Sequence, residues 1–194
     1  MTEITLEEYL KDPCGSSSLP YGKAIAVGKP SGVTVTHGSG EGEGYFRLLH
    51  RLEDVEKPCL KEGFRIGDAE SDAIVAHING CYEGVAITRV QMERYDKALA
   101  VLVKAESTGE IAASGIAELD PVVKEGYLEW IQVSPGYRNR GLGSFVVKEL
   151  LWRMKGVAAF VTVSGKVESM EAERLYRSCG FTGHDVWYVK REEG

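Results

Sequence analysis

The chain has 194 residues, of which 43% are hydrophobic and 27% charged, and these proportions are typical of one folded globular domain rather than a disordered or fibrous chain. Its 29 acidic and 23 basic side chains give a formal net charge of -6, which argues against a nucleic-acid partner and favours cationic partners such as amines. No apolar run approaches the roughly 20 residues that cross a bilayer, and neither a secretory leader nor a C-x-x-C pair is recognisable. We therefore expect a cytoplasmic protein with reduced thiols and no membrane contact.

The first 32 residues differ in pattern from the rest of the chain. Thr5 followed by Glu8 is a capping-box pattern that predicts one short helix. Prolines, a glycine and several serines then interrupt any periodicity. We therefore predict an N-terminal arm over residues 1–32 and a single domain over residues 33–194.

The domain begins with an expected strand over residues 33–36, where β-branched residues alternate. Residues 38–44 are acidic and rich in glycine, which predicts a mobile surface loop. A nucleotide-binding loop is a weaker interpretation of the same stretch, because Glu41 and Glu43 would repel an anion. Helical character is expected over residues 45–52, 71–78 and 89–95.

The middle of the chain predicts strands. Residues 98–103 form a continuous apolar run and residues 110–117 follow after a Ser-Thr-Gly turn, so we expect a β-hairpin. A further strand over residues 127–133 carries bulky groups on both faces and should be central. Alternation along this strand would place on one face Tyr127, Glu129, Ile131 and Val133.

The last third of the chain alternates helices and strands. The clearest helix starts near Leu142 and should stop before Gly156, and a second should end before Gly180. A buried strand is expected over residues 158–163, and a last strand over about residues 186–190. The β-α-β-α-β order implies partly parallel pairing, whereas the preceding hairpin is antiparallel, so the fold should be α/β with a mixed sheet.

The segment after the central strand is the most informative one. It contains Arg138, Arg140, Gly141 and Gly143 directly before the strong helix. Glycines let the backbone approach a ligand closely, and the first-turn amides of a helix favour negative charge in front of them. The arginines can add charge-assisted hydrogen bonds. A diphosphate cradle is the functional interpretation, and a tight strand-to-helix turn with solvated arginines is the structural alternative.

Two spaced motifs resemble those of a known family. The R-x-x-G-x-G pattern over residues 138–143 resembles the acetyl-CoA-binding motif of the GNAT superfamily of N-acetyltransferases, and the A-x-x-L-Y-x-x-x-G-F pattern over residues 172–181 resembles its next signature. The close resemblance covers roughly residues 120–182. It implies an acyl-CoA N-acyltransferase fold, in which a mixed, mostly antiparallel central sheet with parallel splayed strands is flanked by helices.

The resemblance also implies that acetyl-CoA is the acyl donor. Backbone groups of Ile131 and Val133 would pair with the pantetheine arm, and the amides of residues 139–144 would hold the pyrophosphate. Ser169 stands where many relatives have Asn, so it can cap the following helix but offers a different cofactor contact. The implied cofactor-binding residues are Ile131, Gln132, Val133, Arg138, Asn139, Arg140, Gly141, Leu142, Gly143, Ser144 and Ser169.

The implied reaction is direct attack of a primary amine on the thioester in a ternary complex. Tyr176 would protonate the departing thiolate, although a core aromatic on an amphipathic helix is the alternative interpretation. A base must accept the proton of the alkylammonium ion, and Glu129 is preferred to Glu125 because it lies deeper toward the cofactor end. The alternative is that neither serves and that Glu129 is an ion-pair partner. The Val133 amide would meet the oxyanion.

The acceptor stays open between a small-molecule amine and a peptide amine. The resemblance supports neither the ribosomal-protein subclass nor the histone subclass. Ser164 stands where the ribosomal-protein N-terminal acetyltransferases place a Glu, and Tyr127 stands where the histone-type members place their base. The sequence ends soon after Phe181, so we expect the arm or a second copy, in a homodimer, to complete the acceptor wall. The four histidines lack metal-site spacing, and we expect no metal and only surface or satisfied core histidines. A non-catalytic acyl-CoA sensor is the rival function.

Overall fold

The computed structural model describes residues 4–27, 32–82, 84 and 86–191. The helices are α1 (Leu6–Lys11), α2 (Pro13–Ser16), α3 (Tyr21–Val27), α4 (Ser71–Cys81), α5 (Arg89–Met92), α6 (Leu142–Met154) and α7 (Met170–Ser178), with short 3₁₀ helices η1 (Lys97–Leu99) and η2 (Pro135–Tyr137). The strands are β1 (Val33–His37), β2 (Glu43–His50), β3 (Phe64–Gly67), β4 (Ala100–Ala105), β5 (Ile111–Asp120), β6 (Glu125–Val133), β7 (Phe160–Lys166) and β8 (Thr182–Arg191).

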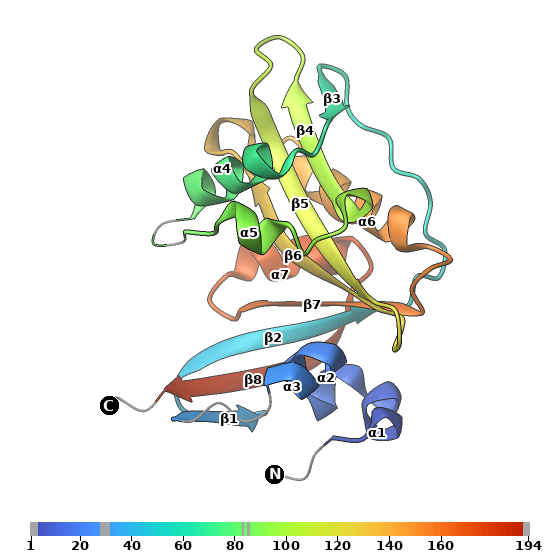
Figure 1. Cartoon of the computed structure of the whole chain (residues 1–194), viewed down its shortest axis with the longest axis vertical. Helices are drawn as coiled ribbons and strands as arrows, with labels where there is room; N and C mark the ends of the chain where they lie inside the picture. Colours follow the sequence, from blue (N-terminus) through green and yellow to red (C-terminus); the bar gives the residue numbers. More distant parts are fainter. Residues whose placement is uncertain (1–3, 28–31, 83, 85, 192–194) are drawn as a thin grey trace. The chain divides into compact units, whose positions relative to one another are not determined.

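The strands form one eight-stranded, mostly antiparallel sheet in the order β1-β8-β2-β7-β6-β5-β4-β3 (Figure 1). Only β6 and β7 pair in parallel, over residues 125–127 of β6, among the ladders of the described residues. The predicted α/β class with a mixed sheet flanked by helices is therefore confirmed. No helix within the described ranges is both long and apolar enough to cross a bilayer.

The chain divides into two compact units. Unit 1 contains Met1–Arg51, Leu119–Tyr127 and Ala158–Gly194, and unit 2 contains Leu52–Glu118 and Leu128–Val157. The boundaries fall inside β5 and β6, so the first three residues of β6 belong to unit 1 and the others to unit 2.

The sheet of unit 1 contains one strand that the sequence pattern does not identify. Residues 45–52 were expected to be helical, but most of them belong to β2, which pairs antiparallel with β7 and with β8. A strand with neighbours on both edges buries side chains on both faces, here Phe46, Arg47 and Leu48. It therefore shows no alternation by which periodicity could tell it from a buried helix. Because β2 lies between β7 and β8, only the first of the two expected crossovers joins neighbouring parallel strands.

The N-terminal segment contributes to the core of unit 1. The predicted capping box is present, since the Thr5 side chain accepts from the Glu8 backbone and the Glu8 side chain accepts from the Thr5 backbone. The sequence pattern does not identify α2 and α3. Tyr9 is fully buried and packs in a cluster with Val123 and Phe160. Residues 4–27 thus carry part of the hydrophobic core.

Unit 2 places helices on both faces of its strands. Ile74 and Ile78 of α4 pack with Ile116 of β5 in one buried cluster. The neighbouring Gly115 faces α6, and a Cβ at this position would lie 2.5 Å from Val146 Cγ1 and 2.6 Å from Ile131 Cδ1. Only glycine permits this close approach of α6 to the strands.

The predicted hairpin is confirmed, because β4 and β5 pair antiparallel.

Candidate functional site

The loop between β6 and α6 is anchored at both ends within unit 2. The backbone N–H of Ser134 donates to the Ala112 carbonyl at 2.9 Å, and the Tyr137 N–H donates to the Ser134 carbonyl at 2.9 Å. At the other end, Asn139 and Gly141 have φ angles of 60° and 81°, and Gly141 is the N-cap residue of α6. These left-handed residues turn the chain into the helix, so the loop has a defined shape.

The amides of this loop are open. In the part of the chain that the structure describes, no hydrogen bond engages the peptide N–H groups of residues 139–143, and the first helical bond runs from Phe145 N to Gly141 O at 3.0 Å. Peptide N–H groups at a helix start carry partial positive charge and lack partners within the helix. The loop therefore offers a run of donors to an anion.

Cationic side chains surround the same loop. The Arg138 guanidinium donates to the Val133 carbonyl at 3.4 Å, and the Arg140 guanidinium donates to the Gly136 carbonyl at 3.3 Å. A Cβ on Gly141 would lie 3.7 Å from Lys61 Nζ, so this ammonium group is also beside the loop. Sequence reasoning missed Lys61, because it lies far upstream in a segment without a motif. The positive charges contrast with the net charge of -6.

The strand that leads into the loop is irregular. Trp130 has a φ of 50°, and a left-handed residue inside a strand interrupts the alternation of faces as a β-bulge does. Trp130 packs on the hydrophobic cluster that contains Tyr95, and Glu129 accepts a hydrogen bond from the Tyr95 hydroxyl. Ile131, by contrast, faces Val146 of α6. The expected common face of Glu129 and Ile131 is therefore wrong, because the bulge places two consecutive side chains on the α4 side.

Glu129 lies in a network of polar groups. The Tyr95 hydroxyl donates to Glu129 Oε2, and Arg94 Nη2 lies 3.5 Å from the same oxygen. Arg94 Nε lies 3.1 Å from Glu118 Oε1, so one guanidinium forms ion pairs with two carboxylates. Burial is the main cause that raises the pKa of Tyr95, followed by its hydrogen bond to Glu129. The phenol is therefore a hydrogen-bond donor at neutral pH, and the Glu129 side chain keeps about one-fifth of its surface exposed (21%).

The other β6 residues expected at the cofactor have partners in unit 2. The Ile131 carbonyl accepts a hydrogen bond of 3.0 Å from the Tyr82 hydroxyl, and burial raises the pKa of that phenol. Gln132 is buried, and its Nε2 donates to Ser114 Oγ. The Gln132 Oε1 atom is buried without a hydrogen-bond partner in the described residues. The side chain of Gln132 thus points into unit 2, and its contribution to ligand binding would come from its backbone.

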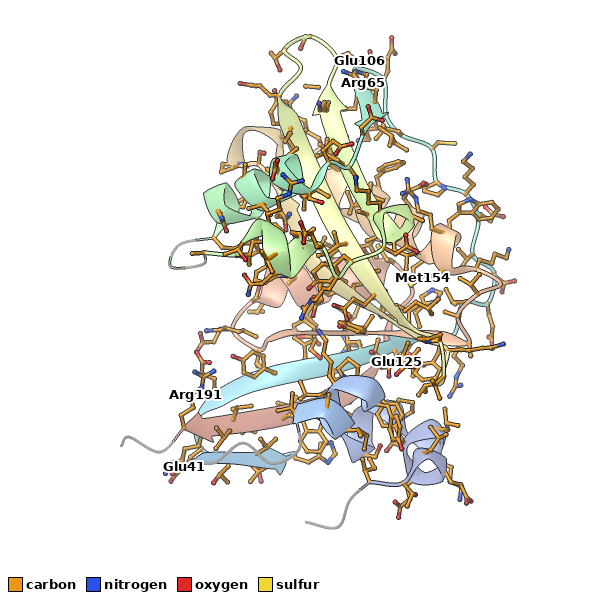
Figure 2. The ribbon with its side chains drawn as sticks, in the orientation of Figure 1. Glu41, Arg65, Glu106, Glu125, Met154 and Arg191 are labelled. Atoms are coloured by element: carbon orange, nitrogen blue, oxygen red, sulfur yellow. The ribbon has the colours of Figure 1, made fainter. Side chains whose placement is uncertain are left out.

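Glu125, labelled in Figure 2, lies in a buried cluster of polar side chains in unit 1. Its carboxylate accepts from the Tyr9 hydroxyl at 2.7 and 2.8 Å, from the Tyr21 N–H at 3.0 Å and from the Thr162 hydroxyl at 2.6 Å. Arg47 Nη2 completes an ion pair at 3.1 Å, and both charged side chains are essentially inaccessible to solvent. These contacts are typical of a carboxylate that stabilises a buried cation in the core.

Tyr176 and Ser169 also belong to unit 1. Tyr176 is 8% exposed, with ring centroids 6.2 Å from Phe46 and 5.8 Å from Phe181. Ser169 is the N-cap residue of α7, but its side chain makes no capping hydrogen bond. The expectation that it caps the helix is therefore wrong. The structure thus brings together the predicted residues of β6 and the loop in unit 2, and places Glu125, Ser169 and Tyr176 in unit 1.

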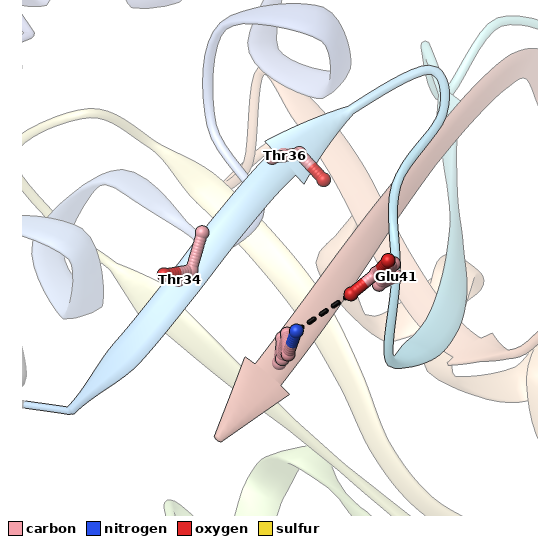
Figure 3. A pocket seen from close by; sticks show the side chains of 4 residues that line it. Thr34, Thr36 and Glu41 are labelled. Carbon is pink, nitrogen blue, oxygen red and sulfur yellow. Dashed lines mark hydrogen bonds and ion pairs between the residues drawn. The ribbon is translucent and has the colours of Figure 1, made fainter. Parts of the chain in front are cut away.

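A separate cavity of about 340 Å³ lies in unit 1 (Figure 3). It is lined by Thr34, Thr36, Glu41 and Lys190, and the Lys190 ammonium donates to Glu41 Oε2 at 2.6 Å. Glu41 comes from the glycine-rich segment for which nucleotide binding was the weaker interpretation. A carboxylate in the wall disfavours a phosphate ligand there, and no predicted site residue lines this cavity.

Comparisons with known proteins agree with the motifs. The model of the acetyltransferase (GNAT) family matches residues 56–181, and no curated protein matches the chain. A GCN5-related N-acetyltransferase structure from Sphaerobacter thermophilus has a TM-score of 0.68 at 16% identity, covering 89% of this chain and 64% of that one. A Drosophila protein has a TM-score of 0.62 at 19% identity, covering 88% and 56%.

A putative GNAT acetyltransferase from Novosphingobium aromaticivorans has a TM-score of 0.58 at 16% identity, covering 87% of this chain and 71% of that one. The chain thus spans less than two thirds of the length of the first two similar structures. At such identities the likeness concerns the fold, whereas the family model covers most of the chain by sequence. The chain belongs to the GNAT acetyltransferase family.

Proposed function

We propose that this GNAT protein transfers an acetyl group from acetyl-CoA to a primary amine by direct attack in a ternary complex. The observation that carries the proposal is the run of open amides at residues 139–143, with Arg138, Arg140 and Lys61 beside it. These donors and charges suit the diphosphate of coenzyme A. When bound, acetyl-CoA would supply the activated thioester.

Glu129 is our candidate for the general base. An alkylammonium acceptor must lose a proton before it attacks, either directly to a base or through water. Glu125 is fully buried, and both of its oxygens are engaged by hydroxyl, amide and guanidinium donors. Glu129 keeps part of its surface exposed beside Arg94. We therefore assign proton acceptance to Glu129 and the stabilisation of a buried arginine to Glu125.

Two further roles follow from the family resemblance and the chemistry of the groups. We propose that Tyr176 donates a proton to the leaving thiolate, since a phenol and a thiol have reference pKa values near 10 and 8.5. The Val133 amide would stabilise the oxyanion of the tetrahedral intermediate.

The acceptor class we favour is a cationic amine. The net charge of -6 would attract a cation. Two carboxylates, those of Glu118 and Glu129, also lie beside Arg94 and add to the negative charge there. Similar folds include a glucosamine N-acetyltransferase region of a fungal multi-domain enzyme, with a TM-score of 0.58, and a ribosomal-protein-S18-alanine N-acetyltransferase from Escherichia coli, with a TM-score of 0.50. Sugar amines and peptide amines therefore both belong in a substrate panel.

A non-catalytic acyl-CoA sensor is the second candidate. The observation that favours it is the engagement of Glu129 by Tyr95 and Arg94, which is also what a purely structural ion pair would show. The two functions share the coenzyme A site. They differ in whether any amine is acetylated.

The test is a calorimetric titration with acetyl-CoA followed by a thiol-release assay over a panel of polyamines, amino sugars and peptides. We expect saturable binding that weakens about thirtyfold when Arg138 and Arg140 are both changed to Ala, since each charge-assisted bond contributes on the order of 1 kcal/mol and the two together about 2 kcal/mol. Arg65→Ala is the matched control, because this exposed arginine of β3 (labelled in Figure 2) lies outside the loop. Binding without turnover across the panel would establish the sensor, and failure to bind would refute the proposed function.

A further inference from the structure

His77 connects α4 to the strands of unit 2 through both ring nitrogens. It is 8% exposed. Its Nδ1 lies 2.8 Å from the hydroxyl of Ser114 on β5, and its Nε2 lies 2.8 Å from the hydroxyl of Ser134, the residue that follows β6. The proposed reaction assigns no role to this imidazole.

The direction of each hydrogen bond follows from one carbonyl group. The Ser134 hydroxyl donates to the Ile111 carbonyl at 2.7 Å, and a hydroxyl has a single proton to donate. Ser134 must therefore accept from His77, so Nε2 carries the proton. In the neutral ring Nδ1 then accepts from Ser114, whose oxygen accepts in turn from Gln132 Nε2. Burial lowers the pKa of His77, in keeping with a neutral ring.

Ser134 joins this series of hydrogen bonds to the loop between β6 and α6, residues 134–141, which we call the diphosphate loop. Its backbone N–H is bound to β5 and its carbonyl accepts from Tyr137, which closes the turn at the start of the loop. Its side chain is held between the Ile111 carbonyl and the His77 ring. The open amides begin five residues later, at Asn139. Fixing the first residue of such a loop reduces the conformational entropy that a ligand must remove when it binds.

We propose that His77 is a positioning residue that holds the start of the diphosphate loop through its Nε2–H bond to Ser134. The inference rests on the proposed coenzyme A function, and it gives His77 no contact with the reacting atoms. The competing account is that the ring only fills space between α4 and the strands.

Two substitutions of His77 separate these accounts. In His77→Gln the side-chain amide reaches near the position of the imidazole Nε2 and can still donate to Ser134. In His77→Asn the amide reaches only the position of Nδ1, so the bond to Ser134 is lost. Ser134→Ala removes the acceptor instead. Asn79→Ala is the matched control, because Asn79 lies on the same helix and makes two hydrogen bonds with the Ile87 backbone.

We expect His77→Asn and Ser134→Ala to raise the Kd for coenzyme A by roughly threefold to tenfold, as loss of one neutral hydrogen bond would, and their double variant to be no worse than either alone. The KM for acetyl-CoA should rise with little change in kcat. Without any ligand, the amides of residues 134–143 should exchange hydrogen faster, while those of β4 and β5 stay protected. His77→Gln and Asn79→Ala should remain within about twofold of the unmodified protein.

Equal losses in His77→Asn and His77→Gln would overturn the inference, because a space-filling role does not distinguish the two nitrogen positions. Unchanged exchange in the loop of His77→Asn would also overturn it. If the unmodified protein binds no coenzyme A, the proposed function fails, and the ligand-free exchange measurement still decides whether His77 holds the loop.

Discussion

Glu129 accepts a hydrogen bond from the Tyr95 hydroxyl, and its chain neighbour Trp130 packs on the hydrophobic cluster that contains Tyr95. Two consecutive strand residues thus point to one side, because Trp130 adopts a left-handed backbone conformation. The bulge sets the carboxylate proposed as the base on the α4 side of unit 2 and Ile131 on the α6 side. The proposed base is therefore positioned by an irregularity of the strand.

Glu129→Gln should lower kcat by about 10²- to 10⁴-fold, the range that general base catalysis contributes. The Kd for acetyl-CoA should not change, because the substitution leaves the loop amides intact. The measurement is steady-state kinetics with the best amine of the panel, alongside calorimetry. Glu118→Gln is the control, since it removes the other carboxylate beside Arg94. Equal rates for Glu129→Gln and the unmodified enzyme would show that the base lies elsewhere.

Glu125→Gln should lower the free energy of unfolding by about 3–5 kcal/mol, because it leaves the buried Arg47 guanidinium without a counter-charge. Urea denaturation measures this loss. Replacing both partners, with Arg47→Met and Glu125→Leu, should recover part of it. Glu43→Gln removes an exposed ion pair with Lys166 and should leave stability unchanged. A Glu125→Gln protein as stable as the original but inactive would instead identify Glu125 as catalytic.

Gly141→Ala should cost about 1 kcal/mol of stability, since its φ of 81° disfavours a side chain. It should also weaken coenzyme A binding, because relaxation of the strained residue redirects the neighbouring amides. Gly136→Ala is the matched control, for a Cβ there would meet no atom within 4 Å and its φ lies outside the left-handed region. Thermal denaturation and calorimetry test both variants, and equal effects at the two glycines would contradict the expected geometry.

The stability of the protein should depend on His77 at acid pH. Burial lowers the pKa of His77 in the folded state, so below the unfolded value near 6.5 the unfolded chain binds a proton that the folded chain does not. The free energy of unfolding should therefore decrease as the pH falls below about 6.5. His77→Gln should flatten this part of the profile, as measured by urea denaturation between about pH 7.5 and 5.5, roughly one unit either side of that reference. An unchanged slope would show that other groups cause the acid sensitivity.

Local patterns predicted the elements that depend on local chemistry. The α6 helix has apolar residues at helical spacing and ends before Gly156, whose φ is 85°, and the capping box of α1 is a short-range signal as well. The β2 strand was missed because its burial on both faces depends on neighbours distant in sequence. The bulge at Trp130 was missed for a related reason, since tryptophan carries no local preference for a positive φ.

The candidate site was predicted where the motif is contiguous. The glycines and arginines at residues 138–143 form one segment, and the structure gives that segment open amides. Lys61 lies beside Gly141 of the loop, and His77 is hydrogen-bonded to Ser134 at its start. Both contacts join residues that are distant along the chain. No spacing rule in a single sequence identifies such contacts, so these two residues were not among the predicted ones.

The buried pair of Arg47 and Glu125 has a practical consequence for anyone who shortens this protein for expression or crystallisation. The Tyr9 hydroxyl donates its one proton between the two carboxylate oxygens, the Tyr21 amide donates to one of them, and the Pro13 carbonyl accepts from the guanidinium. Trimming those residues as a dispensable leader would open two interior charges to water. An insoluble truncated product would then report a damaged core and say nothing about enzymatic competence.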